Sequence, residues 1–503
     1  MKQIVLIICD GMGYSPKKEY NAIANANTPN LNYLYNNYPN CLLKASGEDI
    51  GLPDGQMGTS EANHLIIGSG RIIYQNLLKI DNSIKNNTLK DNEVLLKTIK
   101  HVNENNSTFH IMGILGPGGV HGHSNHIKAL IKIAEDNNIK KISLHLITDG
   151  RDTFPRSSIE YLKDIENYIS DFAEVRISSI SGRYFAMDRD KNMDRTEKYF
   201  NTITKKDFIE ENSAEEIISN SYSKNITDEF IEPVFVKNGH EIKENDGLIF
   251  ANFRSDRAVQ ITRMIYDAKI QNLKFVTMTN YFDDKDTTID IEALFGKEII
   301  NNTLSEVISG NNLKQLKVTE TEKFVHLTFF FNAQKYESEE GEDRIMIDSN
   351  KNVKTHDEKP EMKAKEISSE VVKAISEEKY SFIATNLVNC DMVGHTGNWE
   401  AIIKGVEAVD VAIGKILEEA KKHDATVIIT ADHGNAEEKF DPISNQPITS
   451  HSLNPVPFIV FGEEYKGKTF ANKIGYLNDI APTILNMLNL DIPKEMTGNI
   501  LIK

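Results

Sequence analysis

The stretch Lys2-Gln-Ile-Val-Leu-Ile-Ile-Cys-Asp10 decides the fold, because it is one of three apolar runs that each lead into an aspartate. Residues 381–388 lead to Asp391, and residues 426–431 lead to Asp432. Short runs rich in valine and isoleucine are typical of buried strands in a parallel sheet. Open α/β sheets bind their ligands beyond the carboxyl ends of the strands. The three runs therefore predict a sheet with a functional site at that edge.

The length and net charge of the chain limit the classes of protein to which it can belong. A chain of 503 residues exceeds the size, about 250–300 residues, at which a single core stops growing, so we expect two domains. A net charge of -17 argues against nucleic acid or an anionic membrane as partner. An anionic small molecule is compatible with this charge only if a local cationic pocket receives it. We therefore expect a small-molecule partner.

Cysteine usage and hydropathy bear on the compartment. Cys9, Cys41 and Cys390 are too few and too scattered for a disulfide framework or a thiolate metal site. The apolar run 4–9 is too short for a signal peptide, and no stretch approaches the roughly 18 apolar residues of a membrane span. These features predict a cytoplasmic protein without a membrane partner.

The middle of the chain has its own alternation of strands and helices. Five short runs rich in branched apolar residues predict strands: 110–115, 142–147, 173–178, 247–252 and 274–279. The segments between them have helical periodicity, as at 127–137 and 157–171. Strands that alternate with helices predict a second, mostly parallel sheet.

The order of these blocks predicts an inserted domain. If Asp10 shares a site with Asp391 and Asp432, the two ends of the chain must share one sheet. We expect residues 1–75 and 302–503 to form a discontinuous metal-binding domain and residues 76–301 to form an inserted α/β domain. The linkers are expected at 74–76 and 296–302. Two linkers form a hinge, which allows closure over a substrate.

Aspartates and histidines follow the three terminal strands. The set offers oxygen and nitrogen donors without sulfur: Asp10, Asp391, His395, Asp432, His433 and His451. Such donors suit divalent Mn, Zn or Co, and a pair of metals suits phosphoryl chemistry. Asp391 and His395 are four residues apart, a spacing that is common in surface pairs of Asp and His. The whole set of donors, by contrast, favours a metal centre.

A serine lies in the segment Gly55-Gln-Met-Gly-Thr-Ser60-Glu61, between a Pro-Asp-Gly turn and a helix-like run. One interpretation is a helix cap, because Ser or Thr followed by an acidic residue commonly starts a helix. The other is a nucleophile at a helix N-terminus, where backbone N–H groups stabilise a phosphate. Beside a two-metal site, the second interpretation is favoured.

Arginine is concentrated in the middle block, in loops that follow predicted strands. These loops supply His121, Arg151, Asp152, Arg183, Arg189, Arg254 and Arg257. Each could form an ordinary surface ion pair of little energetic weight. Together they predict a pocket for a small polyanion, since arginine binds carboxylate and phosphate in a bidentate manner. Asp152 is the candidate general acid or base for a substrate hydroxyl.

The motifs resemble one known family along the whole chain. They are Pro53-Asp-Gly-Gln-Met-Gly-Thr-Ser60, Gly182-Arg-Tyr-Phe-Ala-Met-Asp-Arg-Asp190, Thr319-Glu-Thr-Glu-Lys323, Gly341-Glu-Asp-Arg344, Asp391-Met-Val-Gly-His395 and Ala431-Asp-His-Gly-Asn435. The chain resembles the cofactor-independent phosphoglycerate mutases of the alkaline-phosphatase-like superfamily. The resemblance implies a split metal-binding phosphatase-like domain around an inserted transferase domain, and interconversion of 3-phosphoglycerate and 2-phosphoglycerate without 2,3-bisphosphoglycerate.

The same resemblance implies roles for individual residues. Ser60 is the nucleophile that becomes phosphoserine, and Lys323 helps to hold the phosphate. One metal site consists of Asp10, Ser60, Asp432 and His433, and the other of Asp391, His395 and His451. The substrate-binding positions are His121, Arg151, Asp152, Arg183, Arg189, Arg254, Arg257 and Lys323. The resemblance further implies Mn²⁺ at both sites and a monomeric protein.

Three alternatives stay open on the sequence. A metal-dependent phosphatase of the same superfamily would need the metal ligands but no arginine clamp for a carboxylate. A phosphopentomutase would act on ribose phosphates instead. A metal-binding protein without activity would be expected to lack ligands, and the full set is present.

Overall fold

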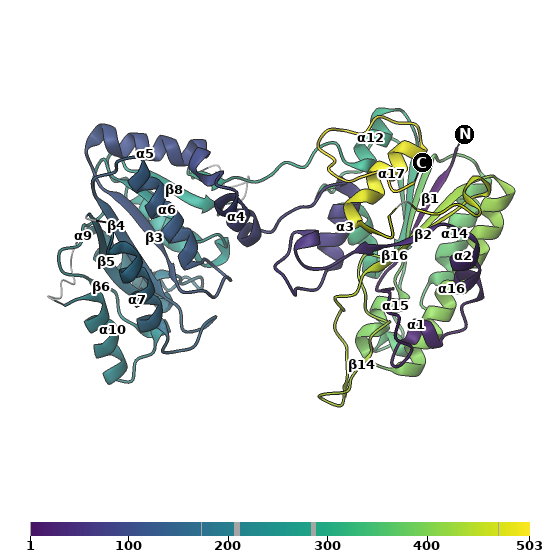
Figure 1. Ribbon diagram of the computed structural model, residues 1–503, viewed down its shortest axis with the longest axis horizontal. Coiled ribbons are helices and arrows are strands. Elements are labelled where there is room, and N and C mark those ends of the chain that lie inside the picture. The colour runs from purple at the N-terminus through teal and green to yellow at the C-terminus, as the bar shows by residue number, and fades with distance from the viewer. Residues whose placement is uncertain (1, 173, 206–211, 283–287, 471, 503) are drawn as a thin grey trace. The chain divides into compact units, whose positions relative to one another are not determined.

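The protein consists of two compact units. The computed structural model describes residues 2–172, 174–205, 212–282, 288–470 and 472–502. One unit comprises Met1–Gln75 and Ile299–Lys503, and the other comprises Asn76–Glu298. Each unit contains a mostly parallel sheet with helices on both faces, as Figure 1 shows. The predicted α/β class is confirmed.

In the described residues, the discontinuous unit has an eight-stranded sheet of order β11-β10-β12-β1-β13-β16-β2-β17. Its strands are β1 (Ile4–Cys9), β2 (Asn40–Lys44), β10 (Gln315–Glu320), β11 (Glu342–Ile347), β12 (Phe382–Leu387), β13 (Thr426–Thr430), β16 (Val456–Phe461) and β17 (Ile474–Tyr476). A small hairpin joins β14 (Phe440–Asp441) and β15 (Gln446–Pro447). β1 pairs in parallel with β12 and β13, so the three predicted runs share one sheet and end at one edge.

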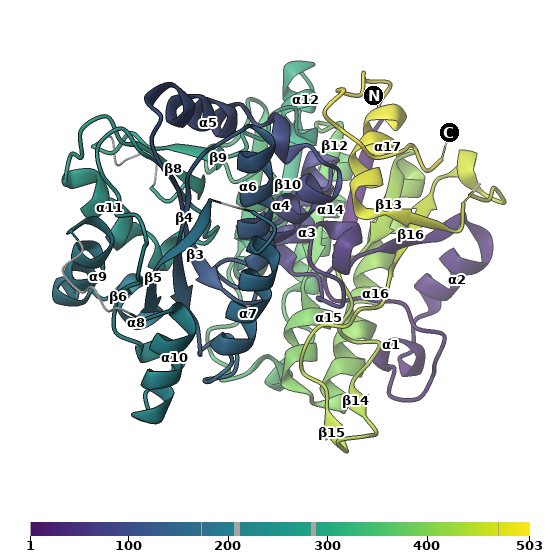
Figure 2. The ribbon, with the colours of Figure 1, turned by 60° about the vertical axis from the view of Figure 1, so that its left-hand side comes forward.

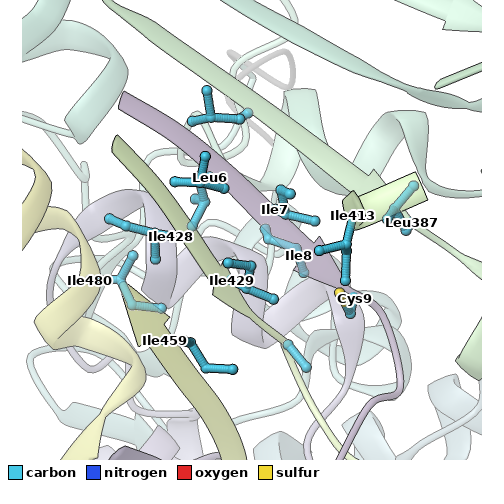
Figure 3. Close-up of a cluster of buried hydrophobic side chains, with 14 of the residues drawn as sticks. Leu6, Ile7, Ile8, Cys9, Leu387, Ile413, Ile428, Ile429, Ile459 and Ile480 are labelled. Carbon is cyan, nitrogen blue, oxygen red and sulfur yellow. The ribbon is translucent and has the colours of Figure 1, made fainter. Parts of the chain in front are cut away.

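Burial on both faces of the sheet explains why these strands are apolar at consecutive positions. All six residues of β1 are buried. Figure 3 shows side chains of β1, β12 and β13 in one cluster with Ile413 and Ile480, which come from helices on opposite faces. A strand covered by helices on both sides needs apolar side chains in both directions.

The helices of this unit divide between the two faces of its sheet (Figure 1). One face carries α3 (Ser60–Ser69), α12 (Leu304–Gly310) and α17 (Ile480–Met487), and the other carries α2 (Pro29–Asn37), α14 (Ala364–Ser376) and α16 (Trp399–Lys422). Short helices at the strand ends are α1 (Ala22–Asn25), α13 (Thr321–Val325), the π-helix η5 (His326–Phe330), α15 (Asn389–Met392) and the 3₁₀-helix η7 (Gly394–Thr396). Further 3₁₀ turns are η1 (Gly47–Ile50), η6 (His356–Glu358), η8 (Glu463–Tyr465) and η9 (Leu477–Asp479).

In the described part of the second unit, a seven-stranded sheet has the order β6-β5-β4-β3-β7-β8-β9. Its strands are β3 (Phe109–Leu115), β4 (Ile142–Thr148), β5 (Val175–Gly182), β6 (Val234–Phe235), β7 (Gly247–Phe250), β8 (Lys274–Thr279) and β9 (Glu292–Phe295). The predicted strands correspond to β3, β4, β5, β7 and β8. Ala173, the first residue of the run expected to form β5, lies outside the described residues.

Helices also cover both faces of the second sheet, as seen in Figure 2. Those that share the larger core are α4 (Asn76–Lys85), α5 (Glu93–Asn105), α6 (Ser124–Asp136), α7 (Ser158–Ile169) and α10 (Ala214–Ser223). Those that share the smaller core are α8 (Arg183–Ala186), α9 (Met193–Lys205) and α11 (Val259–Asp267). Connections of this unit include η2 (Leu89–Asp91), η3 (Asp228–Phe230) and η4 (Ser255–Arg257).

Candidate functional site

Two histidines and a carboxylate converge at the end of β12. Asp391 lies in α15, His395 lies in η7, and His451 precedes β16. The Nε2 atoms of His395 and His451 each lie 3.1 Å from Asp391 Oδ1. The two Nε2 atoms are 3.2 Å apart. The segment is two short helices rather than one, yet the spacing of Asp391 and His395 still brings both to one point.

Hydrogen bonds to backbone carbonyls fix the ring protons of these histidines. His395 Nδ1 lies 2.7 Å from the Thr449 carbonyl, and His451 Nδ1 lies 2.7 Å from the Gly58 carbonyl. A carbonyl only accepts, so Nδ1 carries the hydrogen in both rings. In neutral rings the Nε2 lone pairs then face each other and a carboxylate oxygen. Such a cluster of lone pairs is stable around a cation, and the ring orientation by an outer hydrogen bond is typical of metal ligands.

A second group of side chains lies beyond β1 and β13. Asp10, Asp432 and His433 are fully buried, and Ser60 is the first residue of α3. His433 Nε2 lies 3.0 Å from Ser60 Oγ, 3.3 Å from Asp432 Oδ2 and 3.7 Å from Asp10 Oδ1. Asp432 Oδ2 has no hydrogen-bond partner among the described residues. A buried, unsatisfied carboxylate oxygen beside an imidazole fits the donor set of a second divalent cation.

Close packing of backbones brings the two groups together. Gly11 has a φ of 76°, and a side chain there would place its Cβ 2.6 Å from the backbone nitrogen of Asp391. Glycine at this position therefore lets the turn after Asp10 lie against the helix that carries Asp391. Within this unit, the structure brings together every residue that the sequence predicted as a metal ligand.

Lys323 lies at the centre of the site. It follows β10, in α13, and its Nζ is 2.6 Å from Ser60 Oγ, 2.7 Å from Asp391 Oδ2 and 2.8 Å from Asp10 Oδ1. Burial alone would lower the pKa of Lys323, but the carboxylates of Asp10 and Asp391 outweigh it and raise that pKa. The side chain is therefore a permanent cation beside the serine hydroxyl.

Asp10 and Asp391 have pKa values displaced in opposite directions. Burial and the nearby Asp432 carboxylate raise the pKa of Asp10 to about 7. Burial would also raise the pKa of Asp391, but Lys323 and the two histidines lower it well below its ordinary value. Burial would likewise raise the pKa of Asp432, but His433, His64 and Lys323 lower it. At neutral pH Asp391 and Asp432 are therefore ionised and Asp10 is about half protonated.

The helix that carries Ser60 begins with a side-chain cap. Thr59 Oγ1 accepts a hydrogen bond of 3.3 Å from the Ala62 amide, so the cap function falls to Thr59. The Ser60 hydroxyl is therefore free to face Lys323 and His433. The structure thus places the cap on Thr59, and the role of Ser60 as nucleophile stays a prediction.

Several supporting residues were not predicted from the sequence. Asn386, in β12, donates to Asp10 Oδ2 at 2.7 Å and to His64 Nε2 at 3.1 Å. Asn435 donates to Asp391 Oδ1 at 2.9 Å. Asn386 stands inside an apolar run and was not given a role, although a buried amide in a core strand is itself a signal. Asn435 lies within the Ala431-Asp-His-Gly-Asn435 motif, three residues after Asp432.

In the second unit, Arg183 is held by two carboxylates. Its NH1 lies 2.5 Å from Asp149 Oδ1 and 2.6 Å from Asp152 Oδ2, and its side chain is 2% exposed. Asp149 also accepts hydrogen bonds from the amides of Arg151 and Asp152. Burial would raise the pKa of Asp152, but the hydrogen bond and charge of Arg183 lower it below its ordinary value. Asp152 is thus an ionised carboxylate.

Three of the remaining predicted residues of this unit, His121, Arg189 and Arg254, lie around Asp256. Its carboxylate lies 3.0 Å from Arg189 NH1, 3.1 Å from Arg254 Nε and 3.6 Å from His121 Nδ1. Burial and the charge of Arg183 lower the pKa of His121 to about 4, so this ring is neutral.

The last two predicted residues have separate partners. Arg257 donates to the Met187 carbonyl at 3.3 Å, and Arg151 pairs with Glu229 at 3.5 Å. Burial and the charges of Arg189 and Arg183 lower the pKa of Arg257, which reflects a concentration of positive charge. Asp149 and Asp256, which no prediction named, lie within motifs that supplied their neighbours.

Comparisons with known proteins show the family of this chain. A family model described as the Metalloenzyme superfamily matches residues 2–492. The 2,3-bisphosphoglycerate-independent phosphoglycerate mutase of Clostridium botulinum (strain ATCC 19397 / Type A) is 46% identical over 514 residues, which cover all of this chain and 99% of that protein. The chain belongs to this mutase family. The resemblance noted in the sequence is confirmed, and with it the class of enzyme, an isomerase.

Other members of the mutase family are similar over the same length. The 2,3-bisphosphoglycerate-independent phosphoglycerate mutase of Clostridioides difficile (strain 630) is 45% identical over 509 residues, again covering all of this chain and 99% of that protein. A solved structure of Leishmania mexicana phosphoglycerate mutase at low cobalt concentration is 27% identical, with a TM-score of 0.55 and coverage of 100% of this chain and 98% of that one. Both the sequence and the fold thus follow the mutase family along the entire chain.

Proposed function

We propose that this protein interconverts 3-phosphoglycerate and 2-phosphoglycerate through a phosphoserine at Ser60, without 2,3-bisphosphoglycerate. One observation carries the proposal: the Ser60 hydroxyl, at the N-terminus of α3, lies within 3.0 Å of both Lys323 Nζ and His433 Nε2. A serine hydroxyl is a weak nucleophile unless a base, a cation or a metal activates it. The Lys323 ammonium and the proposed metal ligand His433 both contact this hydroxyl, which supports the proposal.

The residues of the discontinuous unit would carry out phosphoryl transfer. Asp10, Ser60, Asp432 and His433 would hold one divalent cation, and Asp391, His395 and His451 the other. Bound there, two cations lower the pKa of the serine hydroxyl and neutralise charge on phosphoryl oxygens. Ser60 Oγ loses its proton to solvent and attacks phosphorus, and the bond from phosphorus to the glycerate oxygen breaks. The Lys323 ammonium stabilises negative charge on the phosphoryl oxygens throughout. The backbone N–H groups at the start of α3 orient the phosphoryl group.

The residues of the inserted unit would hold the glycerate. Arg189, Arg254 and Arg257 supply donors for the carboxylate and the phosphate, and Arg151 and His121 complete this group. Asp152 would exchange a proton with a glycerate hydroxyl: as an ionised carboxylate it removes the proton from the hydroxyl that attacks in the second half, and it protonates the oxygen that leaves phosphorus only after it has taken up a proton from solvent. Arg183 fixes the orientation of Asp152 through their ion pair.

We further propose Mn²⁺ as the metal, a cytoplasmic location and a monomeric state. The site has oxygen and nitrogen donors alone, which Mn²⁺ accepts. In the described residues, none of the helices has the length and hydropathy to cross a membrane. Cys9, Cys41 and Cys390 are free and buried, which fits a reducing compartment. Metal analysis of protein purified without added metal, and light scattering, test the metal and the oligomeric state.

An enolase-coupled assay tests the activity. Metal-stripped protein receives 3-phosphoglycerate and Mn²⁺, with no 2,3-bisphosphoglycerate. We expect Mn²⁺ alone to restore formation of 2-phosphoglycerate. Release of inorganic phosphate faster than 2-phosphoglycerate forms would instead establish a phosphatase. Turnover of ribose phosphates but not of phosphoglycerate would establish a phosphopentomutase.

A further inference from the structure

We propose that Asp256 is an internal counter-anion that occupies the arginine cluster without substrate and restricts the cluster to polyvalent anions. This inference rests on the proposed function, because it concerns how the inserted unit selects phosphoglycerate. Asp256 is a specificity-determining residue in this view, and its carboxylate is exchanged for the anionic groups of the substrate.

Asp256 pairs with two arginines and is loosely held. Oδ2 accepts a hydrogen bond of 3.0 Å from Arg189 NH1. Oδ1 lies 3.1 Å from Arg254 Nε as an ion pair and has no hydrogen-bond partner among the described residues. The three side chains are 31%, 46% and 53% exposed. Ion pairs at such exposure contribute at most about 1 kcal/mol each, so a stronger anion can displace them.

His121 gives an independent sign that this carboxylate is not tightly bound. Its Nδ1 is buried and faces Asp256 Oδ1 at 3.6 Å, without a hydrogen bond to any described residue. A buried ring nitrogen without a partner costs free energy that a hydrogen bond would recover. An incoming anionic or hydroxyl oxygen can supply that partner once Asp256 moves away.

The buried ion pairs of Arg183 contrast with the exposed ion pairs of Asp256 in the same unit. Arg183 is 2% exposed and lies between Asp149 and Asp152 at 2.5 and 2.6 Å. Removing either partner from a buried pair leaves an uncompensated charge, so this arginine does not exchange its partners. The arginines of the cluster thus fall into two classes: Arg183 is fixed in place, whereas Arg189 and Arg254 are available for exchange.

Charge selectivity follows from the exchange. A monovalent anion that replaces Asp256 gains no more Coulomb energy than the carboxylate it displaces. An anion that carries both a phosphate and a carboxylate gains from every additional charge, because Arg257 and Arg151 lie in the same unit and have no share in the Asp256 ion pairs. Asp256 therefore allows phosphoglycerate to bind to the arginine cluster and prevents formate or chloride from binding there.

The test measures anion binding by the full chain. Divalent metals are chelated so that the metal site takes up no phosphate, and inorganic phosphate and formate are titrated calorimetrically into wild type, Asp256→Asn and Asp190→Asn. Asp190 is exposed and adjacent to Arg189 in sequence, so its substitution changes net charge equally. We expect Asp256→Asn to bind phosphate about tenfold more tightly, the effect of releasing two half-exposed ion pairs, and to bind formate measurably. Asp190→Asn should stay within about twofold of wild type.

Two outcomes would overturn the inference. Phosphate affinity in Asp256→Asn equal to or weaker than that of wild type would mean that the carboxylate only holds the arginines in place. Tighter binding also in Asp256→Glu, which keeps the charge, would mean that geometry and not charge is responsible. In the Mn²⁺-loaded enzyme, Asp256→Asn should lower KM for 3-phosphoglycerate and become sensitive to formate. Because the titrations need no turnover, they remain readable if the mutase assay fails.

Discussion

His395 and His451 face each other beside Asp391, with their Nε2 atoms 3.2 Å apart and both Nδ1 atoms bonded to backbone carbonyls. With the ring protons fixed on Nδ1, neutral rings direct both Nε2 lone pairs at one point beside a carboxylate, which fits a metal site. We expect His451→Asn to lower the bound Mn²⁺ from two ions per chain to one. Elemental analysis after gel filtration measures this ratio. A variant that still holds two ions would show that His451 is not a ligand.

Substitution of Ser60 is the second test of the site. Because Ser60 Oγ is the atom next to both Lys323 Nζ and His433 Nε2, its loss removes the nucleophile together with one of the four proposed ligands of one cation. Ser60→Ala should lower kcat by on the order of 10⁴-fold or more and abolish phosphorylation of the protein by substrate, seen by mass spectrometry. Ser69→Ala, at the other end of α3, is the control and should retain activity. A near-normal rate in Ser60→Ala would exclude the covalent route.

Asn386 should increase the affinity of the site for metal although it is not itself a ligand. It donates to Asp10 Oδ2 and to His64 Nε2, and thereby orients the Asp10 carboxylate. Loss of such an outer hydrogen bond typically lowers metal affinity by about 10–100-fold. We expect this loss in Asn386→Ala, measured by Mn²⁺ titration.

The control for Asn386→Ala is Asn30→Ala. Asn30 bonds Asp410 elsewhere in the same unit, so its substitution removes an asparagine of comparable bonding but should not alter metal affinity. Equal Mn²⁺ affinity in Asn386→Ala and wild type would contradict the orienting role.

The sequence predicted the part of the site that depends on strand ends. Residues 4–9 were expected to form a strand buried on both faces, because a short run rich in branched apolar residues and bounded by Asp-Gly favours a strand over a helix. Parallel strands place their carboxyl ends at one edge, so Asp10 and Asp432 could be brought together without knowledge of the fold. The inserted sheet was likewise evident from alternating periodicity.

The rest of the site depends on contacts between distant segments, which spacing does not encode. Asn386 is a polar residue within a core strand, and the positions of Asp10 and of His64 on α3 together explain it. Asp149 and Asp256 were visible beside predicted residues, but whether a carboxylate faces an arginine depends on backbone geometry at the strand end. The π-helix η5, which follows Lys323, also has no sequence signature in the single chain.

Metal affinity should depend on pH through Asp10. Burial and Asp432 raise the pKa of this carboxyl to about 7, and only the ionised form binds a cation. Below pH 7 one proton must leave Asp10 when the ion of its site binds, so the affinity of that site should fall by up to about tenfold per pH unit, and above pH 7 this dependence should disappear. Mn²⁺ titrations between pH 5.5 and 8.5 measure the slope. An affinity independent of pH below 7 would mean that Asp10 is already ionised.

Asp149 should control both the stability of the inserted unit and the ionisation of Asp152. Asp149→Asn retains an oxygen for the backbone amides but leaves the buried Arg183 with one counter-charge instead of two. We expect the free energy of unfolding to fall by about 1–3 kcal/mol, less than for a fully unpaired buried charge because Asp152 remains. Loss of a neighbouring negative charge also lowers the pKa of Asp152, which an NMR titration of its carboxyl measures directly. Asp164→Asn, which breaks an exposed pair with Lys128, is the control and should leave this pKa unchanged. An Asp152 pKa that stays in place in Asp149→Asn would show that Asp149 does not act on this carboxyl.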